Sequence, residues 1–229
     1  MAETVAADTF FYVKDCALAP IATGIQAQNL NEFRDRIAII HPGCIFFHFW
    51  GSRLRTSIES VEFNNDFSFW SHNFLHDDTL AERLEILDPT EYQDIEKLRH
   101  EILEIIDNRL DELEYIPWAR REHKFHFIRS RIVVFNTPYK IEQPSELIKI
   151  LPLMSRSSIF YHFIDARRRT PNGEDDFTSW LKVLPQNYDN LIFQLKKVDP
   201  FFISLSALQH KLTDIFSEFF LGKQDIIKK

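Results

Sequence analysis

The motif His-Phe-x-x-x-Arg-x-Arg occurs twice in this chain, each time after an aromatic run and before an aspartate. A guanidinium group can hold a carboxylate or a phosphate through two parallel hydrogen bonds, and histidine exchanges a proton near neutral pH. These residues therefore form a candidate site for a small anion. Its polar members are His48, Arg53, Arg55 and Asp66 in the first copy, and His162, Asp165, Arg167, Arg169 and Asp176 in the second.

The second copy of the motif is the more charged one. Asp165 stands where the first copy has Gly51, and Arg168 stands where the first has Leu54. If one copy alone has a polar function, we expect it to be the second.

The same residues have a second interpretation as an internal polar network. A buried histidine requires a carbonyl or carboxylate partner, and a buried arginine requires an aspartate. Two copies of one fold need the same packing, but they seldom both need a catalytic site. Retention of the motif in both copies therefore favours a structural role, and the anion site is the alternative.

Two nucleophile–base pairs have helical spacing. Cys44 lies four residues before His48, and Ser158 lies four residues before His162, a spacing at which the two side chains can meet. Ser158 is also expected near the start of a helix, and no third orienting group is visible. We therefore predict no catalytic residue.

His72 and His76 have the spacing of a helical metal-binding pair, with two aspartates adjacent. The second copy has Lys182 in place of His72, which favours a solvated helix end. Trp70 and Trp180 fit core packing better than a ligand-stacking box. We therefore expect no metal and no cofactor.

The chain contains a long internal repeat. Residues Ile45–Thr56 and Ile159–Thr170 are identical at seven of twelve positions without a gap. The aligned copies span residues 11–110 and 125–220, with a connecting segment at 111–124 and tails at 1–10 and 221–229. This pattern predicts a mainly α fold, in which a tandemly duplicated multi-helix unit with pseudo-two-fold symmetry packs as one globular domain.

Local signals predict about ten helices and a small β element. Each copy opens with an aromatic and β-branched stretch typical of a strand, and the two strands are expected to pair. One helix is predicted to start at Asn29 with Glu32 three residues later, and another after a capping box of Thr90 and Gln93. Residues 19–24, which include the only Ala-Thr-Gly sequence, are predicted to form a turn.

Composition narrows the classes of protein. The net charge of −7 argues against nucleic acid as a partner, and five glycines argue against a phosphate-binding loop. Cys16 and Cys44 are expected to be free thiols. We see no signal peptide and no apolar run of about 18 residues, so we expect a cytoplasmic protein without membrane contact.

The repeat residues also carry a family resemblance. The matching elements are His48-Phe49-Trp50, Asn65-Asp66-Phe67 and Asp88-Pro89 in the first half, and residues 160–169, Asp175-Asp176-Phe177 and Asp199-Pro200 in the second. On these residues, and over nearly its whole length, the chain resembles the bacterial and archaeal family known as domain of unknown function 5752. The resemblance implies a stand-alone prokaryotic cytoplasmic protein and implies no activity.

We therefore expect a non-catalytic protein-binding or adaptor module of a bacterial regulatory or defence-type multi-protein system, with another protein as its partner. The acidic helix at residues 91–114 and any exposed Phe patch would be its contact surfaces. The alternative is a ligand-binding protein or enzyme that acts on a phosphorylated or sugar-like anion through the second copy of the motif. Convergence of these side chains on an open cavity would favour the alternative.

Overall fold

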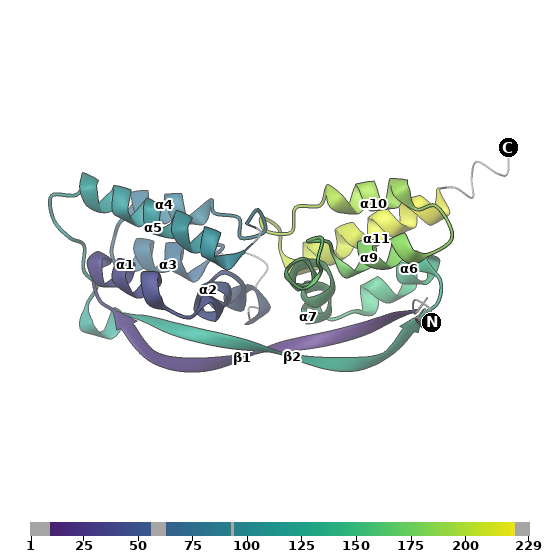
Figure 1. Cartoon of the computed structure of the whole chain (residues 1–229), viewed down its shortest axis with the longest axis horizontal. Coiled ribbons are helices and arrows are strands. Elements are labelled where there is room, and N and C mark those ends of the chain that lie inside the picture. Colours follow the sequence, from purple (N-terminus) through teal and green to yellow (C-terminus); the bar gives the residue numbers. More distant parts are fainter. Residues whose placement is uncertain (1–9, 56–62, 93, 223–229) are drawn as a thin grey trace, which may run out of the picture. The chain divides into compact units, whose positions relative to one another are not determined.

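The computed structural model describes residues 10–55, 63–92 and 94–222, and this part of the chain is mainly helical with a two-stranded antiparallel sheet (Figure 1). The first half contains β1 (Phe11–Ala27), α1 (Leu30–Ile39), α2 (Pro42–Arg55), α3 (Asp66–Asn73), α4 (Asp78–Glu85), α5 (Ile95–Glu112) and the short 3₁₀ helix η1 (Arg121–His123). The prediction of a mainly α fold is confirmed.

The second half presents a similar order of elements. It contains β2 (Phe125–Ile141), η2 (Pro144–Glu146), α6 (Leu147–Ile150), η3 (Leu151–Leu153), α7 (Arg156–Ile159), the π-helix η4 (Phe160–Asp165), α8 (Ala166–Arg169), α9 (Asp176–Val183), α10 (Asp189–Lys196) and α11 (Leu205–Leu221). Since α7, η4 and α8 follow one another without a break, they form one continuous helix, and the described residues then contain ten α-helices. The common origin of the two halves stays a prediction.

The contacts divide the chain into two compact units whose limits differ from those of the sequence repeat. Unit 1 joins the chain up to Ala17 to the chain from Val134 onward, and unit 2 is Leu18–Val133. The helices α1–α5 therefore pack with the beginning of β2, and the helices α6–α11 pack with the beginning of β1. Each 17-residue strand contributes residues to both units.

Aromatic rings form the core of each unit. In unit 2 the ring of Phe33 lies 5.0 Å from that of Phe125 and 4.9 Å from that of Trp70, measured between centroids. In unit 1 the ring of Phe11 lies 5.1 Å from Phe177 and 5.2 Å from Trp180. Both strands thus contribute their first phenylalanine to the helices that follow the other strand.

Polar side chains set most of the helix starts. Asn29 Oδ1 accepts a hydrogen bond from Glu32 N at 2.8 Å, so the predicted start of α1 is confirmed. The capping box predicted for α5 is wrong, because this helix begins at Ile95 with Asp94 as its N-cap. Thr90 Oγ1 instead donates to Asp88 at 2.7 Å, and Gln93 lies outside the described residues.

The turn predicted at residues 19–24 is wrong, because the segment is part of β1. Thr23 Oγ1 donates to Phe127 O at 2.5 Å and accepts from Ile25 N at 3.1 Å. Gly24 has a φ of +75°, a value that glycine adopts at little cost. The irregular backbone is therefore accommodated within the strand, where pairing with β2 outweighs the local turn signal.

Candidate functional site

The structure brings four of the predicted residues of the second motif into one cluster in unit 1. His162 and Asp165 come from η4, Arg169 from α8 and Asp176 from the first turn of α9. Asp176 Oδ2 lies 2.8 Å from His162 Nδ1 and 2.9 Å from Arg169 Nη2. Arg169 Nε donates to Asp165 Oδ2 at 2.9 Å. We call these residues, together with Arg168, the unit 1 cluster.

The two ring nitrogens of His162 are both engaged. The side chain is 3% exposed, and its Nε2 accepts a hydrogen bond from the backbone N–H of Lys14 at 2.8 Å. A nitrogen that accepts a hydrogen bond carries no proton, so the proton is on Nδ1 and is donated to Asp176. This geometry holds His162 as a neutral imidazole in one tautomer.

The histidine of unit 2 has the same arrangement. His48 Nδ1 lies 2.8 Å from Asp66 Oδ2, and its Nε2 accepts from Ile128 N at 3.1 Å. The His48 side chain is also 3% exposed. Lys14 and Ile128 occupy corresponding places in β1 and β2, three residues after Phe11 and Phe125 respectively, and those two phenylalanine rings pack on His162 and His48. Each strand therefore supplies both a hydrogen bond and a ring contact.

The charges of the unit 1 cluster cancel. Arg168 Nη2 donates to Asp165 Oδ1 at 2.9 Å, so Asp165, only 1% exposed, is shared by two guanidinium groups. Burial lowers the pKa of Arg169, but the charge and hydrogen bond of Asp176 outweigh this effect, and the net shift is upward. Two carboxylates balance two guanidiniums, which leaves no net positive charge for an incoming anion.

Of the other predicted site residues, Arg167 stands apart from this cluster. Arg167 Nη2 donates to Val198 O at 3.4 Å, and its guanidinium lies 4.9 Å from the ring centroid of Phe163. The side chains of Arg53 and Arg55 lie outside the described part of the chain. In the second copy, the predicted site residues other than Arg167 therefore lie together. In the first copy, His48 and Asp66 lie together.

The cysteines and Ser158 are not poised as nucleophiles. Burial, together with the charges of Asp165 and Asp15, raises the pKa of the Cys16 thiol to about 12, and burial also raises the pKa of Cys44. Ser158 Oγ donates to Lys14 O at 2.6 Å. A thiol with such a pKa stays protonated at neutral pH.

His72, one member of the possible metal pair, contacts an exposed aspartate. His72 Nδ1 lies 2.7 Å from Asp78 Oδ1, and both side chains are well exposed. Across residues 10–55, 63–92 and 94–222, no group of three or more His, Cys, Asp or Glu side chains is arranged to hold a metal ion. Trp70 Nε1 donates to His123 O at 2.8 Å, and both Trp70 and Trp180 are core residues.

Sequence reasoning missed several members of the network. Arg169 Nη2 also donates to the backbone oxygen of Tyr161, and its guanidinium lies 3.9 Å from the centroid of the Tyr161 ring. Arg168 was visible as part of a basic run, and its i,i+3 spacing from Asp165 on one helix was the signal that could have paired the two side chains. The backbone N–H groups of Lys14 and Ile128 carry no side-chain signal, so only the pairing of strands with distant helices reveals them.

Comparison with known proteins shows one family and one fold. The model of a family of unknown function, DUF5752, matches residues 8–217. The chain is similar to the structure of OrfY from Thermoproteus tenax, with a TM-score of 0.77 and 25% sequence identity, over 91% of this chain and 94% of that one. No curated protein matches it. In the described part of the chain, no helix is both long and apolar enough to cross a bilayer.

Proposed function

We propose that this chain, which belongs to the DUF5752 family of unknown function, is a non-catalytic protein-binding module. The observation that carries the proposal is the engagement of Nε2 in both buried histidines by a backbone N–H. In a nucleophile–His–Asp arrangement this nitrogen must be free to take the proton of the nucleophile. With Nε2 occupied and Nδ1 bonded to an aspartate, the histidine supports packing between a strand and its helices.

The acidic helix is a weaker contact surface than its sequence suggests. Along α5, Glu96 pairs with Arg99, Asp107 pairs with Arg34, and Glu112 pairs with Arg83, with N···O distances of 2.7–2.9 Å. Arginines of the same unit therefore neutralise much of its charge. This pairing favours an apolar surface over an electrostatic one for the partner.

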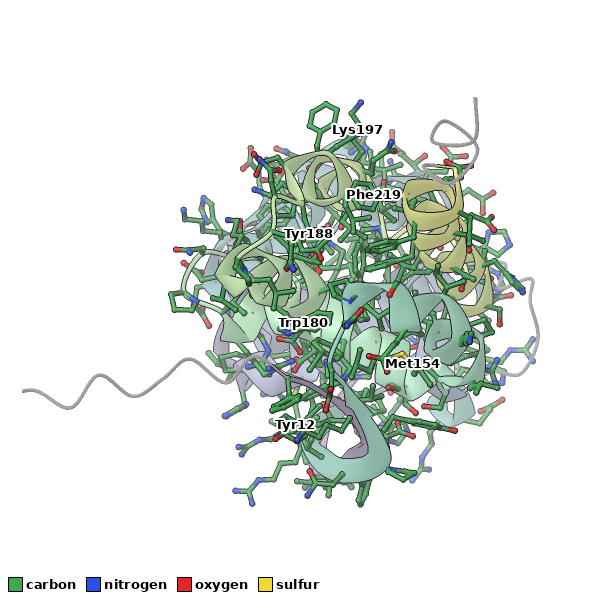
Figure 2. The ribbon with its side chains drawn as sticks, turned by 90° about the vertical axis from the view of Figure 1, so that its right-hand side faces the viewer. Tyr12, Met154, Trp180, Tyr188, Lys197 and Phe219 are labelled. Carbon is green, nitrogen blue, oxygen red and sulfur yellow. The ribbon has the colours of Figure 1, made fainter. Side chains whose placement is uncertain are left out.

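A half-buried aromatic cluster in unit 1 suits that role. The ring of Tyr188 lies 6.1 Å from Phe219 and 6.2 Å from Phe220, where α10 begins and α11 ends (Figure 2). Leu221, the next residue along the chain, is 51% exposed. Aromatic side chains at such positions are enriched in the contact regions of protein partners.

Photo-crosslinking tests this proposal. With p-benzoylphenylalanine at position 219, we expect one discrete crosslinked protein in cells of the native host, and the Phe220→Ser change should reduce its yield. Phe202, which is 52% exposed in the loop before α11, provides the matched control position, and it should give no such product.

The ligand-binding alternative makes an opposite prediction. Nucleotides or sugar phosphates that raise the melting temperature saturably, with the effect lost in both Arg167→Ala and Arg169→Gln, would show a ligand site in unit 1. That result, together with no product at position 219, would refute the protein-binding proposal.

A further inference from the structure

An apolar segment in unit 2 is unusually exposed. Tyr115, Ile116 and Trp118 follow the end of α5, and their exposed fractions are 83%, 48% and 73%. We call these three residues the 115–118 segment. Single exposed apolar residues are common on protein surfaces, but three within four positions, including a tryptophan, are typical of an interaction site.

The backbone of this segment is held in place. Leu30 N donates to Pro117 O at 3.1 Å, and Ala119 N donates to Gln28 O at 2.7 Å. Trp118 also forms an antiparallel bridge with Asn29. The backbone is thus anchored to the end of β1 and the start of α1, while the side chains remain in solvent. Such preorganisation lowers the entropy that binding costs.

Charges of opposite sign flank the segment. Asp111 and Glu114 precede it, and Arg120 and Arg121 follow it, all exposed. Across the part of the chain that the structure covers, none of these four side chains forms an ion pair. Up to Arg121 the order along the chain is therefore acidic, then apolar, then basic, which is self-complementary when two copies run antiparallel, and the exposed Glu122 that follows reduces the positive charge of the basic end.

We infer that the 115–118 segment is the interface of a homodimer with two-fold symmetry. Antiparallel alignment places the acidic end of one copy against the basic end of the other and joins the two sets of aromatic side chains at the centre. Tyrosine and tryptophan each bury about 150–250 Å² when fully covered. Six side chains then contribute on the order of 1,000 Å², close to the lower limit of a specific interface.

A second copy fits this surface better than an unrelated protein, because the chain itself supplies the complementary charge pattern. The inference is independent of the proposed function, since Tyr188, Phe219 and Phe220 belong to the other unit. The dimer is expected to be weak, because an interface near about 1,000 Å² falls at the low end of the size range, where transient complexes are found. Its stability should fall as salt rises, because exposed ion pairs are screened.

Sedimentation velocity of the full chain tests the inference at protein concentrations from about 1 µM to about 1 mM, the range in which a weak dimer forms. We expect a reversible monomer–dimer equilibrium that Trp118→Ser weakens at least thirtyfold, the size of effect that a central aromatic contact gives. Ile39→Ser is the matched control, since Ile39 is 72% exposed at the opposite end of α1 from Leu30, and it should leave the equilibrium unchanged.

A charge exchange tests whether the flanking charges contribute to the dimer, as opposed to the apolar side chains alone. The variants R120E/R121E and D111K/E114K should each be monomeric, and their equimolar mixture should recover a 1:1 dimer. Circular dichroism establishes that each variant is folded. A wild-type chain that stays monomeric throughout, a Trp118→Ser variant that dimerises as the wild type does, or a mixture that recovers no dimer would each overturn the inference.

Discussion

The surroundings of His48 in unit 2 and of His162 in unit 1 share one hydrogen-bond pattern but differ in the charges around it. In both, an aspartate accepts from Nδ1 and a strand N–H donates to Nε2. In unit 1 the helix widens into η4, which ends at Asp165, whereas α2 is a regular helix with Gly51 at the matching place. A side chain at position 51 would crowd the ring of Phe47, because a Cβ on Gly51 would lie 3.0 Å from that ring. The shared pattern joins each strand to its helices, and Asp165 and Arg168 add charges that Gly51 and Leu54 cannot supply.

The strands show a second difference, four residues after Phe11 and Phe125. Asp15 accepts hydrogen bonds from Ser157 Oγ at 2.6 Å and Ser155 Oγ at 2.8 Å, where α7 begins. Arg129 occupies the matching place in β2, close to the start of α2, where a Cβ on Gly43 would lie 3.3 Å from the Arg129 Cγ. Among the residues that the structure describes, the Nε of Arg129 is buried and has no hydrogen-bond partner. A carboxylate suits the start of a helix, and a cation does not.

The largest expected effect tests which helices each strand stabilises. Phe125→Ala should destabilise α1–α5 by about 4 kcal/mol, and Phe11→Ala should destabilise α6–α11 by a similar amount, because each ring is buried among those helices. Hydrogen exchange of the helix amides measures each unit separately.

The neighbouring positions provide the controls. His126→Ala and Tyr12→Ala remove exposed side chains from the same strands, and we expect changes within about 0.5 kcal/mol. If Phe125→Ala loosened only α6–α11, the assignment of the strand segments to the units would be wrong.

The charges of unit 1 give the next largest effect. Asp165→Ala should reduce the free energy of unfolding by about 3 kcal/mol, because it removes the buried partner of two guanidiniums. Arg168→Ala, on a side chain that is 59% exposed, should cost less than about 1 kcal/mol. Hydrogen exchange of the α8 and α9 amides measures both, and equal costs would contradict this account.

The pH dependence of unit 1 tests the burial of Cys16. The folded-state pKa of about 12 lies above the ordinary value of 9.0, so the unfolded chain loses this proton first and stability falls as pH rises above 9. Between pH 9 and pH 11 the loss should be roughly 2 kcal/mol. The matched variant is Cys16→Ala, in which this part of the decline should be absent; the same slope in both chains would exclude Cys16 as its source.

The smallest expected effect concerns Arg129. Arg129→Met removes a buried donor without a partner and keeps the apolar stem, so it should stabilise unit 2 by about 1 kcal/mol. Thermal unfolding compares it with Arg131→Met, an exposed position on the same strand where we expect no change. Destabilisation by Arg129→Met would mean that the guanidinium has a favourable role in the folded chain.

Much of the local structure was predictable because its causes lie within a few residues. The start of α1 follows from Asn29 and Glu32, which hydrogen-bond within one turn. The convergence of His162 and Asp176 was also predictable in kind, because the motif recurs with matched spacing. The start of α5 and the strand at residues 19–24 were not, because Asp94 competed with an equally good local signal and pairing with β2 overrode a turn sequence.

The sequence by itself determined a helical chain with an aromatic core, since composition and helical spacing depend on neighbouring residues, and it left the partner of each buried histidine open between a carbonyl and a carboxylate. Only the tertiary structure decided that each strand begins among the helices that follow the other strand. It also decided that a backbone N–H of that strand donates a hydrogen bond to Nε2 of each buried histidine. A backbone amide is the same in every residue except proline, so its partner depends on which distant segments meet. That choice follows from the burial of Phe11 and Phe125 in the two cores.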